Sequence, residues 1–348
     1  VISARVDRLE RESKRILQEA SVIGRSFYYE ILKRTTALKN NIDKNLSSLE
    51  RVDLIKTKSI QPDLEYIFKH VLTQEVVYNG LLKKERKKIH ERIAIVIEQL
   101  FQDRIAEFYE TLAFHFSRGQ SLDKAVSYLM KSAKKSLARY SIKESHQYYK
   151  HAFEILDRKV QKTDAEKELL IELLIEWAYV FYYRGYFKDL SEVFRSNKMI
   201  AESLKDKSNL GMFYSWYGWA LFCEYKVIES YPYFKKALQI GEELKDQRVM
   251  GYACTWLTWY YLLSGKLDLS IQSGLKAQEV SKVFQADAYL YFKSLTGLGF
   301  AYSTSGDIKK SIEIGNELVI YGKKHSNVRS LTMGYAVLGG AYEIDNDL

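Results

Sequence analysis

One period in the second half of the chain limits the folds that are open to it. A turn position recurs at spacings of 40, 40 and 41 residues, at Gly185, Tyr225, Gly265 and Gly306. Apolar residues follow helical patterns on both sides of each turn. A helix-turn-helix unit of this length cannot bury its own apolar face, so neighbouring units must stack and share a continuous core. The sequence therefore predicts an all-α superhelix of helical hairpins over residues 161–348.

Other residues repeat with the same offset. Trp216 and Trp219 recur 40 residues later as Trp256 and Trp259. The last unit has only its first helix, and the chain begins with Val1 rather than Met. We therefore expect the chain to be an internal piece of a longer protein.

Proline is almost missing from the sequence. Pro62 and Pro232 are the two prolines among 348 residues, whereas average usage of roughly 5% gives about 17. Because proline breaks helix interiors, its scarcity predicts a nearly all-helical chain.

Composition excludes several classes of protein. Hydrophobic residues make up 47% of the chain, enough for packed domains, which excludes bulk disorder. No apolar run reaches the roughly 18 residues of a membrane helix, so no membrane span is predicted. The two cysteines, Cys223 and Cys254, are too few for a disulfide scaffold or a zinc site. They fit a reducing compartment, and we expect a cytoplasmic protein.

Charge divides the chain into a basic and a neutral part. Residues 1–160 contain 31 Lys and Arg against 21 Asp and Glu, whereas residues 161–348 contain 22 against 23. A basic first part fits a polyanionic partner such as nucleic acid or a nucleotide phosphate. The neutral second part argues against nucleic acid wrapped along its length.

The opening region has the element order of a winged helix. Apolar spacing predicts helices over 9–23, 27–35 and from about 41 to 54. Strands follow over 55–60 and 65–68, the only clear strand signals in the chain. Residues 1–82 are therefore predicted to form a small α+β winged-helix domain, and residues 83–160 a linker helix with irregular helical hairpins. The basic run 83–88 is either a patch for phosphate or an acidic partner, or a solvated helix face.

Catalytic motifs are missing from the sequence. It contains no phosphate-binding loop, no dinucleotide-binding glycine pattern and no nucleophile elbow. His146 and His151 lie five residues apart, a poor spacing for one helix face. We therefore predict no catalytic residue, no metal site and no cofactor in this chain.

The repeats resemble the tetratricopeptide repeat (TPR) family, with units about six residues longer than the usual 34. The resemblance rests on small residues in the first helix of each unit, at Ala178, Gly218, Thr258, Gly299 and Gly339. It implies that the next residue in each unit faces the concave side, which aligns Tyr179, Trp219, Trp259 and Phe300. We call these four residues the aromatic wall. They would bind a protein, another domain or a small-molecule ligand; the alternative is packing between units.

The opening third resembles a second family. The resemblance rests on the segments VISARVDRL at 1–9, LQEASVIGRSF at 17–27, LERVDLI at 49–55 and YIFKHVLTQEVVY at 66–78. Together they are similar to the winged-helix region that follows the ATPase core in bacterial signal-transduction (STAND/AAA-type) ATPases with repeats. The likeness is greatest to proteins whose N-terminal part is a class III adenylate or guanylate cyclase. It implies a non-catalytic regulatory and protein-interaction arm, with the ATPase core as partner and ATP/ADP and Mg bound in that core, outside this chain.

The same resemblance assigns a role to one histidine. In that class of ATPases a histidine at the end of the last winged-helix strand contacts the β-phosphate of ADP, and His70 matches its position. The alternative is that His70 caps the next helix or packs under the wing.

Two other functions stay open. One is a winged-helix DNA-binding regulator with a TPR sensor, reading DNA with residues 41–54 and the wing residues Lys56 and Lys58. The net charge of −1 on that helix disfavours a nucleic-acid partner. The other is a stand-alone TPR scaffold.

Overall fold

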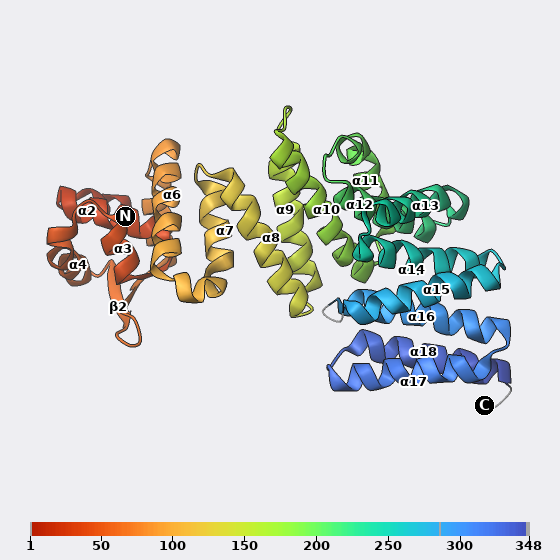
Figure 1. Ribbon diagram of the computed structural model, residues 1–348. Coiled ribbons are helices and arrows are strands. Elements are labelled where there is room, and N and C mark those ends of the chain that lie inside the picture. Colours follow the sequence, from red (N-terminus) through yellow and green to blue (C-terminus); the bar gives the residue numbers. More distant parts are fainter. Residues whose placement is uncertain (1, 285–286, 346–348) are drawn as a thin grey trace. The chain divides into compact units, whose positions relative to one another are not determined.

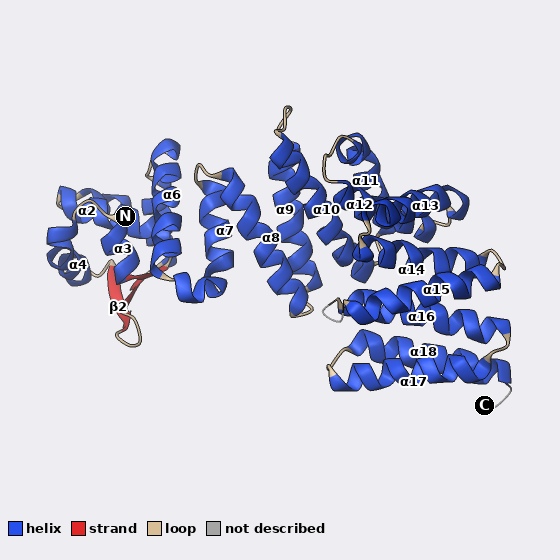
Figure 2. Ribbon diagram, viewed as in Figure 1, coloured by secondary structure: helices blue, strands red, loops and turns tan. Residues whose placement is uncertain are grey.

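The computed structural model describes residues 2–284 and 287–345, most of them in helices (Figures 1 and 2). Contacts divide the chain into two compact units, Val1–Lys159 (unit 1) and Val160–Leu348 (unit 2). No helix in the described ranges combines the length and the apolar character of a bilayer-spanning segment. The predicted fold class is confirmed: a small α+β region precedes an all-α stack of TPR-like helical hairpins.

The first part of unit 1 contains short helices and a three-stranded sheet. Its elements are α1 (Ile2–Asp7), α2 (Arg11–Ile23), β1 (Ser26–Tyr28), α3 (Tyr29–Thr35), α4 (Ile42–Arg51), β2 (Ile55–Ser59), β3 (Glu65–Phe68) and α5 (Val71–Asn79). The sheet is antiparallel with the order β1-β3-β2, and β2 and β3 form a hairpin. Helical spacing places Ile16, Leu17 and Ala20 on one face of α2, where all three are buried in a core with Phe27 and Phe68.

The structure corrects one prediction in this part. Phe27 and Tyr28 were expected to begin the second helix, but they lie in strand β1. Phe27 pairs with Tyr66 of β3, and its side chain is 1% exposed. Tertiary packing on the hairpin therefore overrides the local helical pattern.

The rest of unit 1 is helical. It contains α6 (Lys83–Leu100), a 3₁₀ segment (Gln102–Phe108), α7 (Tyr109–Arg118), α8 (Leu122–Ala138) and α9 (Ile142–Asp157). Helix α6 packs on both α2 and α3, and α7, α8 and α9 pack in sequence after it. The proposed boundary at residue 82 thus lies inside a unit whose elements contact one another, and the division into a winged-helix domain and a linker region stays a prediction.

Unit 2 is a stack of antiparallel helices (Figure 1). Its elements are α10 (Asp164–Arg184), α11 (Phe187–Glu202), α12 (Lys207–Cys223), α13 (Val227–Leu244), α14 (Gln247–Leu263), α15 (Leu267–Val283), α16 (Ala288–Ser305), α17 (Ile308–Lys324) and α18 (Val328–Asp345). The first helices of successive hairpins, α10, α12, α14, α16 and α18, each contact the next one. These helices form the inner wall of the stack.

The recurring turn position has one backbone conformation. Gly185, Gly265 and Gly306 have φ values of 72°, 69° and 87°, and Tyr225 has 62°. This left-handed region favours glycine, which explains the glycine at three of the four positions. In unit 1, Tyr140 between α8 and α9 has φ 57° and so makes the same kind of turn.

A buried serine joins the two helices of several hairpins. Ser145 Oγ donates to the carbonyl of Ala133 at 2.8 Å in unit 1. In unit 2, Ser270 Oγ donates to Thr258 at 2.8 Å and Ser311 Oγ to Gly299 at 3.0 Å. Each bond joins residues 12 positions apart, so the same serine-to-carbonyl hydrogen bond joins the two helices of a hairpin in both units.

Small residues on the inner helices allow close packing where a second helix covers them. A Cβ atom at Gly218 would lie 2.6 Å from the ring of Phe234 on α13. At Gly339 on α18, a Cβ atom would have no neighbour within 4 Å. The close approach at Gly218 therefore depends on the paired helix of the hairpin.

Candidate functional site

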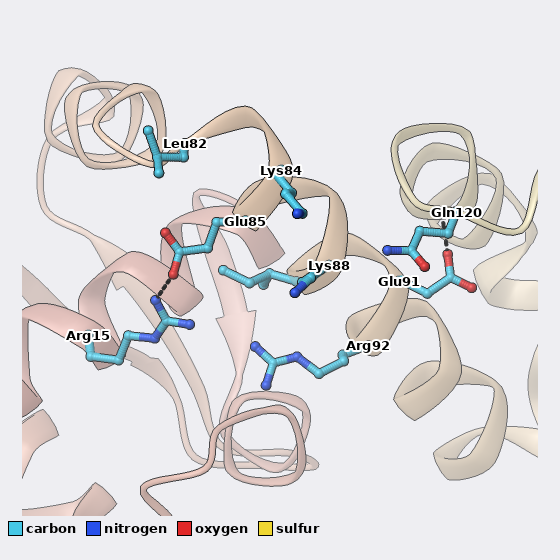
Figure 3. A pocket seen from close by; sticks show the side chains of 9 residues that line it. Arg15, Leu82, Lys84, Glu85, Lys88, Glu91, Arg92 and Gln120 are labelled. Carbon is cyan, nitrogen blue, oxygen red and sulfur yellow. Dashed lines mark hydrogen bonds and ion pairs between the residues drawn. The ribbon is translucent and has the colours of Figure 1, made fainter.

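A group of basic side chains in unit 1 lines a pocket between α2, α6 and the start of α8. The pocket has a volume of about 860 Å³. Its lining residues are Arg15, Leu82, Lys84, Glu85, Lys88, Ile89, Glu91, Arg92 and Gln120 (Figure 3). We call it the basic pocket, because four of these side chains are cations and two are carboxylates.

Several charges of the basic pocket are satisfied within unit 1. Arg15 pairs with Glu85 across the pocket (Figure 3). Buried Glu19 accepts from Arg15 at 3.3 Å and from Arg92 at 3.2 Å through the same oxygen. Glu91 accepts the backbone N–H groups of Gln120 and Ser121 at the start of α8. These groups hold α2, α6 and α8 together.

Lys84 and Lys88 remain available in the basic pocket. They are one helical turn apart on α6, both are exposed, and neither makes an ion pair with a described residue. Two cations on one helix face attract an anion, although exposed lysines are strongly hydrated. Both interpretations of the basic run 83–88, a partner patch and a solvated helix face, stay predictions.

Unit 1 also buries two histidines in contact with each other. Nδ1 of His90 lies 2.9 Å from Nδ1 of His115, and the Tyr78 hydroxyl lies 3.1 Å from Nε2 of His90. Burial lowers the pKa of His90 to about 4 and that of His115 to about 3. Both rings are therefore neutral at pH 7, and a consistent chain has Tyr78 donating to His90 and His90 donating to His115.

The four residues of the aromatic wall differ in burial and in the rings that they contact. Trp259 and Phe300 are half-buried, with ring centroids 5.8 Å apart. The ring of Tyr179 contacts Trp216, which is outside the aromatic wall, with centroids 4.8 Å apart. Trp219 is 6% exposed and stacks on Trp256, with centroids 4.2 Å apart. The wall is thus packed against a second set of aromatic residues, while its role in binding stays a prediction.

A lysine lies at the centre of this aromatic packing. Lys293 of α16 is 6% exposed, and its Nζ lies 5.0 to 5.8 Å from four ring centroids. The rings belong to Tyr182 on α10, Trp219 on α12, and Trp256 and Trp259 on α14. We call these five residues the Lys293 cluster. Four inner helices contribute to it.

Hydrogen-bond donors in the Lys293 cluster have no acceptor. The indole Nε1 atoms of Trp219, Trp256 and Trp259 are buried without a partner. Lys293 forms no hydrogen bond or ion pair with a described residue. A buried donor without an acceptor costs free energy, so this concentration of open donors is unusual for a packed core.

Positive charge dominates the Lys293 cluster. Burial lowers the pKa of Lys293 to about 8, which leaves most of the ammonium groups charged at pH 7. Burial also raises the pKa of Cys223 to about 12, so this neighbouring thiol is neutral. Arg329 of α18 lies over the ring of Tyr182 at 5.8 Å and adds a second cation.

His70 lies two residues after β3 and directly before α5. It is exposed, and its side chain makes no capping hydrogen bond. It is also not among the buried residues under the hairpin. Its imidazole therefore faces solvent within this chain.

Some charges on the third helix and the hairpin have partners, whereas Lys44, Arg51 and Lys56 are exposed without an ion pair to a described residue. Asp43 accepts from the Tyr29 hydroxyl at 2.7 Å, and Glu50 accepts from Thr57. Lys58 on β2 pairs with Glu65 at 2.9 Å. This pairing reduces the positive surface that a DNA-reading helix and wing would need.

The Lys293 cluster was missed from the sequence, although a signal was present. In the 41-residue offset, Lys293 replaces Tyr252 and Gly297 replaces Trp256. A Cβ atom at Gly297 would lie 3.0 Å from Nε1 of Trp259. These two departures from the repeat pattern therefore mark the place where the ammonium group of Lys293 lies among aromatic rings.

The chain is similar to a known sequence over part of its length. No protein-family model matches it. It is 30% identical over 110 residues to an uncharacterized protein of Rhizobium meliloti (strain 1021), a match that covers 31% of this chain and 10% of that protein.

Among solved structures, the chain is similar to a STAND (signal transduction ATPase with numerous domains) protein with a tetratricopeptide repeat sensor from Pyrococcus horikoshii. The identity is 17% and the TM-score 0.47, over 97% of this chain and 54% of that one. It is also similar to aspartyl phosphate phosphatase F from Bacillus subtilis, with 13% identity, a TM-score of 0.45, and coverage of 99% and 86%. The chain thus spans about half the length of the STAND protein.

Proposed function

We propose that this chain is the non-catalytic regulatory and protein-interaction arm of a signalling ATPase. In this proposal residues 1–82 are a winged-helix domain that docks on the nucleotide-binding core of the parent chain. The repeats of unit 2 bind a protein or small-molecule ligand and bias the exchange of ADP for ATP. The output domain of the parent is a class III nucleotidyl cyclase.

The observation that carries the proposal is the exposure of His70. His70 follows β3, at the position that the family resemblance gives to a phosphate-contacting histidine. Its imidazole is exposed and makes no capping hydrogen bond to α5. An imidazole can donate a hydrogen bond to a phosphate or become charged near it. The order of helices and hairpin in unit 1 and the stacked hairpins of unit 2 support the same architecture.

Coupling between the repeats and the nucleotide requires two states. A ligand on unit 2 shifts the equilibrium only by the difference between its affinities for the closed, ADP-bound form and the open form. The proposal therefore predicts that ligand binding and ADP binding change each other by the same factor.

The test replaces His70 by Ala in the intact parent protein and measures the dissociation rate of a fluorescent ADP. Loss of a phosphate contact is expected to speed dissociation by about tenfold, the equivalent of roughly 1.4 kcal/mol. His325→Ala is the matched control, because His325 is also exposed and lies in unit 2. An unchanged dissociation rate in His70→Ala would refute the nucleotide role.

A further inference from the structure

We propose that the Lys293 cluster is a binding site for a carboxylate group. This inference deepens the proposed function by naming the ligand class that the repeats recognise. The cluster joins a buried cation from α16 to three open indole donors and to aromatic rings from α10, α12 and α14. None of its polar groups is used in packing the hairpins together.

The rings stabilise the ammonium group of Lys293 without completing its hydrogen bonds. Four ring centroids lie within 5.8 Å of Nζ, and ring faces attract a cation. A ring face, however, is a weak acceptor for the three N–H bonds of an ammonium group. The indole N–H groups of Trp219, Trp256 and Trp259 are also donors only. Neither Lys293 nor these indoles has an acceptor among the described residues.

The charge of the cluster points to an anion. No described carboxylate pairs with Lys293, and the neighbouring thiol of Cys223 stays protonated. Arg329 adds positive charge at Tyr182. A buried cation without a partner is strongly unfavourable, so an anion that enters the cluster gains both a counter-charge and hydrogen bonds.

A carboxylate fits this set of groups better than a phosphate. It carries a single charge, which one buried lysine neutralises, and its two oxygens accept several hydrogen bonds from ammonium and indole donors. A phosphate carries nearly two charges at pH 7, and the second charge would have only the half-buried Arg329 as a partner. The flat aromatic faces would pack on the apolar carbon chain that bears the carboxylate.

Lys293 itself is 6% exposed, and the residues around it differ in exposure. Tyr182, Trp259 and Arg329 are half-buried, whereas Trp219 and Trp256 are buried. The ligand would therefore approach between α10, α14 and α18, where its carboxylate meets Arg329 before Lys293.

The experiment titrates the 348-residue chain with sodium acetate, against sodium chloride at equal ionic strength. Binding is followed by tryptophan fluorescence and by the NMR signals of the indole N–H groups, with Trp177 as the internal reference. We expect saturable shifts at Trp219, Trp256 and Trp259, and a rise of the melting temperature by at least about 2 °C at saturation.

Two variants isolate the role of the charge. Lys293→Met keeps the bulk of the side chain without its charge and is expected to lose the acetate response. Lys293→Arg keeps the charge and is expected to retain it. If Lys293→Met does not fold, as judged by circular dichroism, Lys293→Gln takes its place. Equal responses to acetate in the wild type and the uncharged variant would overturn the proposal, as would a response to inorganic phosphate without one to acetate.

A pair of peptides identifies the source of the carboxylate. Tetraglycine with a free C-terminus is compared with its C-terminal amide. Tighter binding of the free peptide than of acetate assigns the site to a peptide terminus, and binding of acetate alone assigns it to a small acid. The carboxylate site can fail in this experiment while the ADP test on His70 succeeds, so the two proposals are tested separately.

Discussion

Unit 1 buries two histidines in contact with each other, whereas unit 2 buries one lysine among aromatic rings. The histidines lose their charge because burial lowers their pKa well below 7. They then complete a hydrogen-bonded chain with Tyr78. Lys293 keeps its charge at pH 7, and the indoles around it keep their donors open.

Buried polar groups that have hydrogen-bond partners serve the packing, whereas buried groups without partners can bind a ligand. Both units use the same hairpin device, a serine that donates to a carbonyl 12 residues earlier. In unit 1 the buried Glu19 accepts a hydrogen bond from the half-buried Arg92. Among the described residues of unit 2, Lys293 and the indoles of Trp219, Trp256 and Trp259 carry hydrogen-bond donors without acceptors within one cluster. A ligand is therefore expected at the repeats, and docking chemistry at the exposed groups of unit 1.

The largest expected effect comes from removing a ring of the Lys293 cluster. Trp256 is fully buried, so Trp256→Ala should destabilise unit 2 by about 3 to 5 kcal/mol. Phe300→Ala removes a half-buried ring at the edge and should cost clearly less. Urea unfolding followed by far-ultraviolet circular dichroism measures both. Similar losses for the two variants would show that the cluster is no more central to the packing than its edge.

Acid should destabilise unit 1 before unit 2. The histidine pKa values fall from 6.5 in the unfolded chain to about 4 and 3 in the fold, so their contribution is complete above pH 6.5 and is lost as the pH falls toward 4. Between pH 7 and 5 the pair should cost roughly 2 to 4 kcal/mol.

The two units can be followed separately in the same sample. All five tryptophans lie in unit 2, so fluorescence reports unit 2 alone and circular dichroism reports both units. At pH 5 the urea transition seen by circular dichroism should begin before the fluorescence transition. The double variant His90→Gln/His115→Gln should weaken this acid sensitivity, and equal sensitivity in the variant would assign it to other groups.

Removing the buried charge of unit 2 should increase the stability of that unit. Lys293→Met should stabilise unit 2 by about 1 to 3 kcal/mol at pH 7, because the folded protein no longer buries an unpaired cation. The lowered pKa of Lys293 means that the wild type regains this stability as the pH rises from 8 toward 10.5. The advantage of the variant should therefore be smaller at pH 9.5, as measured by the urea midpoint of tryptophan fluorescence. A less stable variant at pH 7 would show that the ammonium group is already satisfied.

The smallest expected effect comes from the left-handed turn between helices that the two units share. Tyr140 and Tyr225 occupy left-handed turns with φ values of 57° and 62°. Replacing either residue by Gly should stabilise its unit by about 1 kcal/mol, since glycine avoids the steric strain of this region. Gly265→Ala, at the equivalent turn, should destabilise unit 2 by a similar amount. Thermal unfolding compares the three variants, and a gain in only one unit would mean that the turns are not equivalent.

The sequence predicts most of the helices because their apolar periodicity and turn residues are local. Gly185, Gly265 and Gly306 mark turns that need a left-handed residue, and the structure places a helix on each side of them. Strand β1 could not be predicted, since Phe27 becomes a strand residue only by pairing with Tyr66, 39 positions later.

The Lys293 cluster depends on the curvature of the stack. Tyr182 and Lys293 are more than 100 positions apart and meet because α10 and α16 both face the inside of unit 2. No periodicity gives that curvature. The breaks at Lys293 and Gly297 could mark the residues, but not the rings that surround them.

The central claim is that this chain regulates an ATPase, and the coding sequence upstream of Val1 in the source DNA tests it most directly. The account predicts a phosphate-binding loop and an acidic metal-binding strand within about 300 residues, the length of one large ATPase core, preceded by the output domain. A start codon directly before Val1 would contradict it and would leave a helical binding protein without a nucleotide-driven core.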